Sequence, residues 1–401
     1  MLTPRQIELV KATVPVLREH GVALITHFYQ RMLNGNPELR NIFNTAHQAH
    51  GQQQKALAMA VLAYAENIEN PAVLMPAVEH IATKHCTLGI RAEQYAIVGR
   101  HLLASIKEVL GEAATDELVE AWAAAYQQLA DILIGVESAI YAEQTTMEGG
   151  WSGWRPFKVL ERKEESPDVV SFDLVPADGG AVPNYKPGQF ISVRTYLKDR
   201  GIVQPRQYSL SRAPGAKNTL RISVKRVKNA EGVEGAMSSH LHKYLQAGDV
   251  IDVSAPAGVF FIEDKETPVV LLSAGIGVTP VLAMLEHIAA KTPDRPVVFI
   301  HCNHDVEHVA LKEDIHAAMA ALKNGKAYMF LTVLPQGPSC SCMQPGRLTA
   351  EKLAALNLDK VSDVYMCGPV GFMDDMKKAL ADEGFASGQV HAEVFGTGTM
   401  Q

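Results

Sequence analysis

The spacing of apolar residues changes twice along this chain of 401 residues, and each change marks a different kind of structure. Residues 1–145 show helical periodicity, residues 157–265 show short alternating runs, and residues 266–401 show apolar strands that alternate with helices. A single hydrophobic core stops growing at about 250–300 residues. The sequence therefore predicts a multidomain fold with an all-α domain, an antiparallel β-barrel and an α/β domain with a doubly wound sheet.

The all-α segment opens with the capping box Thr3-Pro4-Arg5-Gln6, which satisfies free backbone N–H groups at a helix start. Three glycines and Pro156 interrupt the helical pattern after its last run, so residues 146–156 are predicted to be a linker. In the barrel segment, only "SSHLHKYLQ" has the pattern of a helix. The helices expected in the first segment cover, after the capping box, residues 19–33, 51–68, 73–88, 92–110 and 116–143.

Charge and hydropathy exclude several classes of function. The chain has 37 basic and 44 acidic residues, a net charge of −7, and no basic run interleaved with aromatic residues. Nucleic acid is therefore not an expected partner. No stretch of 18 uncharged apolar residues and no apolar signal-peptide core are present. We accordingly expect a cytoplasmic monomer without integral membrane contact.

The five cysteines are scattered and none forms a C-x-x-C pair. This spacing argues against a disulfide framework, a zinc ribbon and an iron–sulfur cluster. We expect the cysteines to be reduced thiols. They lie at positions 86, 302, 340, 342 and 367.

The segment "SAGIGVTP" follows an apolar stretch and opens a helical pattern. Gly275 and Gly277 would let the backbone approach a pyrophosphate at the start of that helix. The third glycine of a dinucleotide-binding fingerprint is missing, so the segment also fits a tight turn in any α/β domain. The next strand runs into "IHCNHD", which has no arginine for a 2′-phosphate and so favours NADH over NADPH.

The segment "RQYS", residues 206–209, has side chains suited to a flavin nucleotide. Arg206 can pair with a phosphate, Tyr208 can lie against the flavin ring, and Ser209 can hydrogen-bond to the ring edge. In isolation these residues also fit an ordinary barrel strand. Further segments accompany them in order, namely "KPGQF" before the arginine, "GAMSS" with Gly235 and Ser238, "CGP" at 367–369 and "EVFG" at 393–396.

Together these segments resemble the ferredoxin-NADP reductase superfamily over about residues 155–397. The resemblance implies a FAD-binding barrel followed by a nicotinamide-binding domain, with Phe395 against the flavin. Phe190 follows "PGQ" where relatives of the flavohaemoglobin type commonly have tyrosine, so one FAD contact would lose a hydroxyl. The residues implied to bind the two cofactors are Phe190, Arg206, Gln207, Tyr208, Ser209, Ser238, Gly275, Ile276, Gly277, Val278, Thr279, Pro280, Cys367, Glu393, Val394, Phe395, Gly396 and Thr397.

A histidine lies in the middle of an apolar helical stripe in "AVEHIATKHCTLGI". Val78, Ile81, Ala82 and Leu88 share one face with His85 at helical spacing. Such a histidine is most often a satisfied core residue. A reductase, however, needs an electron acceptor, and the helical segment is the other candidate in the chain. Without C-x-x-C-H a covalent haem is excluded, whereas a b-type haem needs only an axial histidine in an apolar helical pocket.

The helical segment also resembles a known family. The segments "HFYQRM", "LRNIFN", "GQQQKALA", "IATKHC" and "EQYAIVG" occur in the order found in the globin domain of bacterial flavohaemoglobins, and the whole chain is identified as a member of that family. The resemblance implies that His85 is the proximal haem ligand, with Tyr29, Gln53 and Leu57 on the distal side. Taken singly, these residues and Phe43, which is expected beside the haem, also fit core or surface positions.

The resemblance assigns a proximal relay to Tyr95 and Glu137. A carboxylate that accepts the proton of the ligand histidine pushes electron density toward the iron, which favours O–O chemistry over reversible storage. Glu137 lies on an apolar helix face, although it also fits a surface position. Lys84 and Glu393 are expected to tune charge near the contact of haem and flavin, or else to be solvated.

These features predict a nitric oxide dioxygenase that combines NO with O₂ to give nitrate at a b-type haem. NAD(P)H gives up electrons in pairs whereas haem accepts them singly, so FAD is required between the two. Two alternatives stay open at this point. One is a haem-dependent reductase of peroxides or lipid hydroperoxides, and the other is an oxygen-binding or sensing globin.

Overall fold

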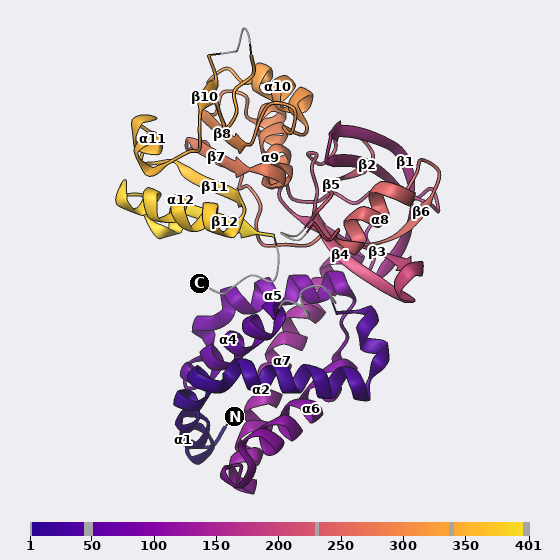
Figure 1. Ribbon diagram of the computed structural model, residues 1–401, viewed down its shortest axis with the longest axis vertical. Coiled ribbons are helices and arrows are strands. Elements are labelled where there is room, and N and C mark those ends of the chain that lie inside the picture. Colours follow the sequence, from indigo (N-terminus) through magenta and orange to yellow (C-terminus); the bar gives the residue numbers. More distant parts are fainter. Residues whose placement is uncertain (1, 44–50, 229–231, 337–340, 396–401) are drawn as a thin grey trace.

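The chain folds into a helical domain, an antiparallel sheet domain and a parallel sheet domain (Figure 1). The computed structural model describes residues 2–43, 51–228, 232–336 and 341–395. The predicted fold class is confirmed by this architecture. Among the helices in these ranges, none has the length and apolar character needed to cross a membrane.

The helical domain includes α1 (Pro4–Ala12), α2 (Val14–Gly35), η1 (Pro37–Asn41), α4 (Gln52–Glu66), η2 (Pro71–Leu74), α5 (Met75–Leu88), α6 (Ala92–Leu110), η3 (Gly111–Ala113) and α7 (Asp116–Thr146). Helix α2 packs against α4 and α6, and α5 packs against α7. The predicted capping box is confirmed, because the Gln6 amide donates to the Thr3 hydroxyl at 3.2 Å and the Thr3 amide donates to the Gln6 side chain at 2.9 Å.

The second domain has strand order β4-β3-β6-β1-β2-β5. Leu210, just after β4, bridges Ile222 of β5, and the amide of Ser211 donates to the carbonyl of Arg221 at 2.9 Å. The outer strands therefore meet and close the sheet as a barrel. Its elements are β1 (Trp154–Ser166), β2 (Val169–Pro176), β3 (Phe190–Leu197), η4 (Lys198–Arg200), β4 (Ile202–Ser209), β5 (Leu220–Lys225), α8 (Ala236–Tyr244) and β6 (Val250–Ser254).

The third domain is a parallel sheet in the order β10-β9-β8-β7-β11-β12. The chain order reverses between β7 and β11, and such a switch point opens a crevice at the carboxyl ends of the two strands. Its elements are β7 (Val269–Ala274), η5 (Gly275–Gly277), α9 (Val278–Lys291), β8 (Val297–Asn303), α10 (Lys312–Ala321), β9 (Gly325–Leu331), β10 (Met343–Pro345), α11 (Ala350–Ala355), β11 (Asp363–Gly368), α12 (Val370–Asp382), η6 (Ser387–Gln389) and β12 (Val390–Val394).

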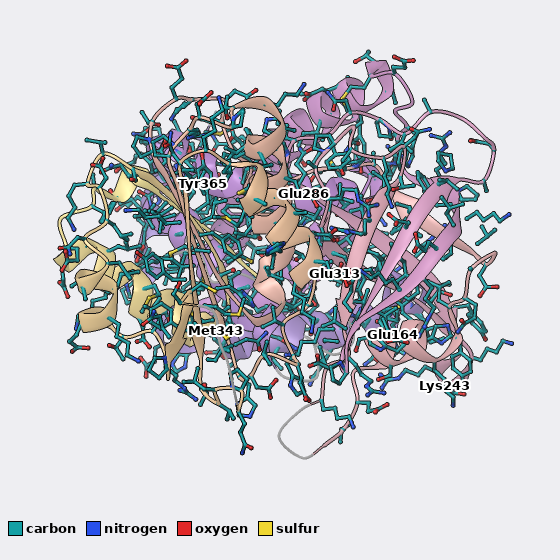
Figure 2. All side chains as sticks on the ribbon, turned by 90° about the horizontal axis from the view of Figure 1, so that it is seen from above. Glu164, Lys243, Glu286, Glu313, Met343 and Tyr365 are labelled. Atoms are coloured by element: carbon teal, nitrogen blue, oxygen red, sulfur yellow. The ribbon has the colours of Figure 1, made fainter. Side chains whose placement is uncertain are left out.

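The helices of the third domain cover opposite faces of its sheet. Helices α9 and α10 share one apolar core, and α11 and α12 share another. Seen from above, Glu286 of α9 and Glu313 of α10 lie between Tyr365 of the parallel sheet and Glu164 of the antiparallel sheet (Figure 2). The α9–α10 layer therefore faces the barrel.

The cysteines only partly meet expectation. Cys86, Cys302 and Cys367 are free thiols, but Cys342 is disulfide-bonded. The prediction that all cysteines are reduced is therefore wrong for Cys342, because a disulfide depends on the distance between two cysteines in the fold and not on C-x-x-C spacing. Cys340 lies outside the described residues.

Candidate functional site

The histidine of the apolar stripe, His85, forms hydrogen bonds with side chains of α6 and α7. Its Nδ1 lies 2.7 Å from Oε1 of Glu137 and 3.1 Å from the hydroxyl of Tyr95. The Tyr95 hydroxyl donates to the same Glu137 oxygen at 2.5 Å. Glu137 is 2% exposed, so its carboxylate depends on these two donors in place of water. The three side chains form one connected proximal set.

Burial and the nearby Glu137 raise the pKa of Tyr95 well above its ordinary value, so Tyr95 stays a donor. Its backbone is fixed as well, because the hydroxyl of Tyr126 donates to the Tyr95 carbonyl at 2.6 Å. The Tyr126 ring packs against Gly99, where a Cβ would lie 2.5 Å from the ring. Sequence reasoning missed Tyr126, whose role depends on a helix contact that spacing alone does not show.

The distal candidates come together on α2, α4 and the segment after η1. Tyr29 is 5% exposed, and its ring centroid lies 5.7 Å from that of Phe43 in an edge-on arrangement. The side chain of Gln53 hydrogen-bonds to the Tyr29 hydroxyl. Burial raises the pKa of Tyr29 well above its ordinary value, so this hydroxyl keeps its proton. Leu57, one helical turn after Gln53, is half-buried and packs on the same core.

These residues fit a haem. The hydrogen bonds described for His85 involve Nδ1, which leaves Nε2 as the nitrogen that can ligate iron. A carboxylate behind Nδ1 is the partner that fixes the tautomer and orientation of a ligating histidine. Tyr29 offers a buried donor from another helix of the same domain.

The flavin candidates lie on β4 and its neighbour β3. Phe190 pairs with Ser209 across the two strands. Burial raises the pKa of Tyr208, whereas it lowers the pKa of Arg206 by disfavouring the charged guanidinium. Arg206 donates to the Gln204 side chain at 3.2 Å and to the Pro205 carbonyl at 2.6 Å. A partly buried guanidinium that donates to these neutral acceptors fits a site for an anionic phosphate.

Phe190 and Ser238 also have structural roles. The Phe190 ring packs on Gly258, where φ is +128° and a Cβ would lie 3.0 Å from the ring. The Ser238 hydroxyl accepts the amide of Val227 at 3.2 Å and donates to the Gly235 carbonyl at 3.2 Å. Ser238 therefore fixes the turn that leads into α8, next to the strands that carry the flavin candidates.

The nicotinamide candidates surround the switch point of the parallel sheet. Gly275 has φ of +54°, a left-handed conformation that favours glycine, and a Cβ on Gly277 would collide with the carbonyl of Cys367. The turns after β7 and β11 are thus in direct backbone contact. Thr279 is buried and its hydroxyl donates to the Ile276 carbonyl at 3.0 Å. Val278 and Pro280 begin α9, at the helix end that favours a phosphate.

Two further candidates meet across a domain boundary. Lys84 of α5 and Glu393 of β12 attract each other electrostatically, while burial lowers the pKa of Lys84 and raises that of Glu393. Cys367 is fully buried, and burial raises its thiol pKa well above the usual range. Val394 is half-buried and Phe395 is 43% exposed. Gly396 and Thr397 lie outside the described residues.

Strand β4 also contacts the helical domain, which sequence reasoning did not anticipate. The side chain of Gln207 donates to the hydroxyl of Thr87 at 3.0 Å. Thr87 lies on α5, two residues after His85. At the other end of the strand, Gln204 donates to the carbonyls of Arg40 at 2.9 Å and Phe43 at 3.4 Å. Strand β4 thus contacts both α5, the helix that contains His85, and the segment that contains Phe43. Periodicity shows no sign of such a contact, because it joins residues far apart in the chain.

Three family models match successive parts of the chain. Globin matches residues 26–133, the oxidoreductase FAD-binding domain matches residues 156–262, and the oxidoreductase NAD-binding domain matches residues 271–378. The fold and these matches define a haem-containing flavoprotein that uses a nicotinamide nucleotide. The chain is an NAD(P)H-dependent oxidoreductase with haem and FAD as cofactors.

Full-length relatives narrow this class further. The chain is 52% identical over 401 residues to the flavohemoprotein of Bordetella parapertussis, with 99% of both chains covered, and 48% identical over 406 residues to that of Chromobacterium violaceum, again with 99% of both covered. A crystal structure of the flavohemoglobin from Malassezia yamatoensis, with bound FAD and haem, matches with a TM-score of 0.87 and 30% identity over 98% of this chain and 100% of that one. The chain belongs to the flavohaemoprotein family.

A shorter solved structure matches the two C-terminal domains. It is the FAD/NAD-binding domain of the nitric oxide dioxygenase from Vibrio cholerae, with a TM-score of 0.55 and 36% identity. The match covers 60% of this chain and 98% of that one.

Proposed function

We propose that this protein is a nitric oxide dioxygenase. One NO, one O₂ and one electron combine to give one nitrate ion, so the two electrons of one NAD(P)H support two turnovers and release NAD(P)⁺ and a proton. The likeness to a domain of the Vibrio cholerae nitric oxide dioxygenase supports this assignment. When bound, the haem supplies the site at which NO and O₂ combine, and FAD divides the hydride of NAD(P)H into single electrons.

The observation that carries the proposal is the proximal set. His85 would ligate the iron through Nε2, while Glu137 accepts a hydrogen bond from Nδ1 at 2.7 Å. A buried carboxylate gives the imidazole anionic character and makes it a stronger electron donor. The Tyr95 hydroxyl keeps this carboxylate oriented at 2.5 Å. A storage globin needs no such donor, because strong electron donation favours oxygen chemistry over reversible binding.

On the distal side, Tyr29 would donate a hydrogen bond where negative charge develops on oxygen. Its raised pKa keeps the hydroxyl protonated, and the hydrogen bond with Gln53 limits the positions it adopts. Phe43 and Leu57 provide apolar surface beside it that excludes water. A pre-oriented donor in a dry site stabilises such charge more than water does.

In the reductase part, Arg206 would pair with a FAD phosphate, with Tyr208 and Ser209 at the flavin ring and Gln207 and Ser238 beside them. The turn from Gly275 to Gly277, with Thr279 and the segment at Cys367, would hold the nicotinamide nucleotide. Lys84 and Glu393 would adjust the charge between the domains, since the two side chains attract each other electrostatically across the domain boundary.

The test follows NO consumption in air by the purified holoprotein. Wild-type protein should consume two NO for each NADH oxidised, and the rate should fall to the background without O₂. Glu137→Gln, which weakens donation by His85, should lower turnover by about 10–100-fold while haem remains bound. Glu143→Gln, at an exposed position on the same helix, is the matched control and should behave as wild type. NADH oxidation driven by hydroperoxides but not by NO would contradict the proposal.

A further inference from the structure

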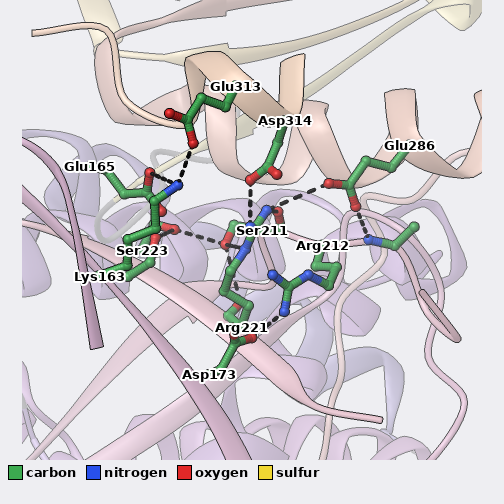
Figure 3. A network of polar contacts seen from close by, with 12 residues as sticks. Lys163, Glu165, Asp173, Ser211, Arg212, Arg221, Ser223, Glu286, Glu313 and Asp314 are labelled. Carbon is green, nitrogen blue, oxygen red and sulfur yellow. Dashed lines mark hydrogen bonds and ion pairs between the residues drawn. The ribbon is translucent and has the colours of Figure 1, made fainter. Parts of the chain in front are cut away.

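A cluster of charged side chains joins the flavin domain to the nicotinamide domain. Arg221 of β5 is 4% exposed at its side chain and reaches two carboxylates of the other domain. Its Nη1 donates to Oδ2 of Asp314 on α10 at 2.5 Å, and its Nη2 lies 3.6 Å from Oε1 of Glu286 on α9. Figure 3 shows the three side chains between the two helices and the barrel strands. We name Arg221, Glu286 and Asp314 the interdomain cluster.

Contacts within the barrel fix the side chain of Arg221, which extends to the nicotinamide domain. Its Nε donates to the hydroxyl of Ser211 at 3.1 Å, and its Nη2 donates to the Ser211 carbonyl. Ser211 lies two residues after β4, the strand with the flavin candidates. The neighbouring ion pair of Arg212 and Asp173 stays within the barrel, so it cannot orient one domain against the other.

Glu286 makes a second contact with the same segment. Its Oε2 accepts the backbone amide of Ala213 at 2.7 Å, four residues after Ser209. One carboxylate therefore faces a fixed guanidinium with one oxygen and a fixed backbone amide with the other. Two contacts from different directions determine the position of α9 relative to β4 more closely than one contact could.

Helix α9 connects this cluster to the nicotinamide site. The helix begins at Val278, directly after the turn from Gly275 to Gly277, and Glu286 lies eight residues further on. At 1.5 Å per residue this separation is about 12 Å along one rigid helix. A shift of α9 at Glu286 therefore moves the nucleotide-binding turn by a similar amount.

We propose that Glu286, held by Arg221 and the Ala213 amide, is a positioning residue for hydride transfer, because it fixes the nicotinamide-binding turn relative to the flavin-binding strand. Hydride transfer moves a proton with two electrons from the nicotinamide ring carbon to a flavin ring nitrogen, breaking a C–H bond and forming an N–H bond. Its rate is sensitive to placement, since a displacement of about 1 Å can cost about 10²-fold. The proposal goes beyond the dioxygenase assignment and does not depend on it, because flavin reduction precedes any event at the haem.

Buried ion pairs contribute little net stability, because desolvation of the charges offsets their attraction. Removing one partner of a buried pair is destabilising, but in Glu286→Ala the guanidinium of Arg221 keeps Asp314 as its counter-charge, so we expect the variant to fold with an altered arrangement of the two domains. The chain offers a matched control in Lys163 and Glu313, which pair at 2.9 Å across the same two domains but are 43% and 79% exposed at their side chains. Exposed pairs of this kind have little effect on stability, so we expect their loss to leave the arrangement of the two domains unchanged.

The experiment measures reduction of FAD by NADH in the full-length holoprotein, without O₂ or NO, by stopped flow. Glu286→Ala should lower the limiting rate by about 10–100-fold, with the NADH concentration for half-maximal rate changed less than about threefold. Glu286→Gln keeps an acceptor for the Ala213 amide and should recover most of the rate. Glu313→Gln should match wild type. Unchanged reduction in Glu286→Ala, or an equal loss in Glu313→Gln, would overturn the proposal.

Two further measurements separate positioning from a general loss of structure. Hydrogen exchange of the Ala213 amide should accelerate in Glu286→Ala and stay at the wild-type rate in Glu313→Gln. Arg221→Lys keeps the buried charge but cannot contact two carboxylates and Ser211 together, so it should lower the limiting rate in the same direction even if Glu286→Ala does not fold. Two results would contradict the proposed role. One is hydrogen exchange of the Ala213 amide in Glu286→Ala that is as slow as in wild type, and the other is reduction of FAD by NADH at the wild-type rate in Arg221→Lys.

Discussion

Tyr29 is deeply buried, and its hydroxyl hydrogen-bonds to the side chain of Gln53. A tyrosine hydroxyl that is removed from water resists ionisation, and burial raises its pKa above the ordinary value of 10.0. The hydroxyl therefore remains a hydrogen-bond donor at neutral and moderately alkaline pH. The contact with Gln53 and the edge-on ring of Phe43 limit the directions in which it donates.

Tyr29→Phe keeps the ring and removes only this donor. The expected result is faster release of O₂ and a loss of NO turnover of about 10²–10³-fold, by analogy with the removal of one oxyanion donor. Haem content and the rate of FAD reduction by NADH should be unchanged. The measurements are stopped-flow O₂ release and steady-state NO consumption.

Tyr64→Phe is the control for this prediction. Tyr64 is 2% exposed and donates to the Gln128 side chain at 2.9 Å, so the variant also loses a buried hydroxyl. It should lose some stability to unfolding but no turnover. Equal turnover in Tyr29→Phe and wild type would remove Tyr29 from the distal site.

At the scale of elements, β4 connects the flavin candidates to the helical domain. The contact between Gln207 and Thr87 ends two residues from His85, and Thr87 in turn donates to the Lys84 carbonyl at 2.9 Å. Gln207→Leu should slow electron transfer from FAD to haem several-fold, because the strand and the proximal helix lose a fixed contact. FAD reduction by NADH, which does not cross this contact, should slow less than haem reduction does.

A double-mutant cycle makes this prediction specific. Thr87→Val removes the acceptor of the same hydrogen bond, so the double variant should be no slower than either single variant. The measurement is the rate of haem reduction after FAD has been reduced. Additive losses would show that the two side chains act independently and would contradict the proposed connection.

The loop after β8 bears on the choice of nucleotide. Asp305 lies just beyond this strand, and the hydrogen bond from His308 is the main cause that lowers its carboxyl pKa. Asp305 is therefore ionised at neutral pH, and it would repel a 2′-phosphate bound at the end of this strand. We predict a higher kcat/KM for NADH than for NADPH, and a smaller ratio in Asp305→Asn. Equal use of both nucleotides by wild type would contradict this.

The sequence predicts local features of these elements well. The capping box at Thr3 and the glycine turn before α9 have the expected conformations, because both depend on residues adjacent in the chain. Helix α2 begins at Val14 and not at residue 19, since Pro15 is accommodated in a first helical turn. Contacts such as Gln207 with Thr87 could not be predicted, because neither composition nor spacing encodes how separate domains meet.

At the scale of the whole molecule, α5 with His85, β4 with the flavin candidates and β12 with Glu393 lie where the three domains adjoin (Figure 1). Polar contacts join each pair of neighbours, through Gln207 and Thr87 on one side and through Glu286 and Arg221 on the other. This arrangement suits a chain that passes electrons from NAD(P)H through FAD to haem. The central proposal is that these electrons support the dioxygenation of NO to nitrate.

The most direct test of that claim uses ¹⁸O₂ with NO and NADH. A dioxygenase transfers both atoms of O₂ to its product, so nitrate formed by the wild-type holoprotein should contain two labelled oxygen atoms and one from NO. Protein without haem should form no more labelled nitrate than buffer does. Product nitrate with one labelled atom or none, or nitrite as the main product, would contradict the assignment of this protein as a nitric oxide dioxygenase.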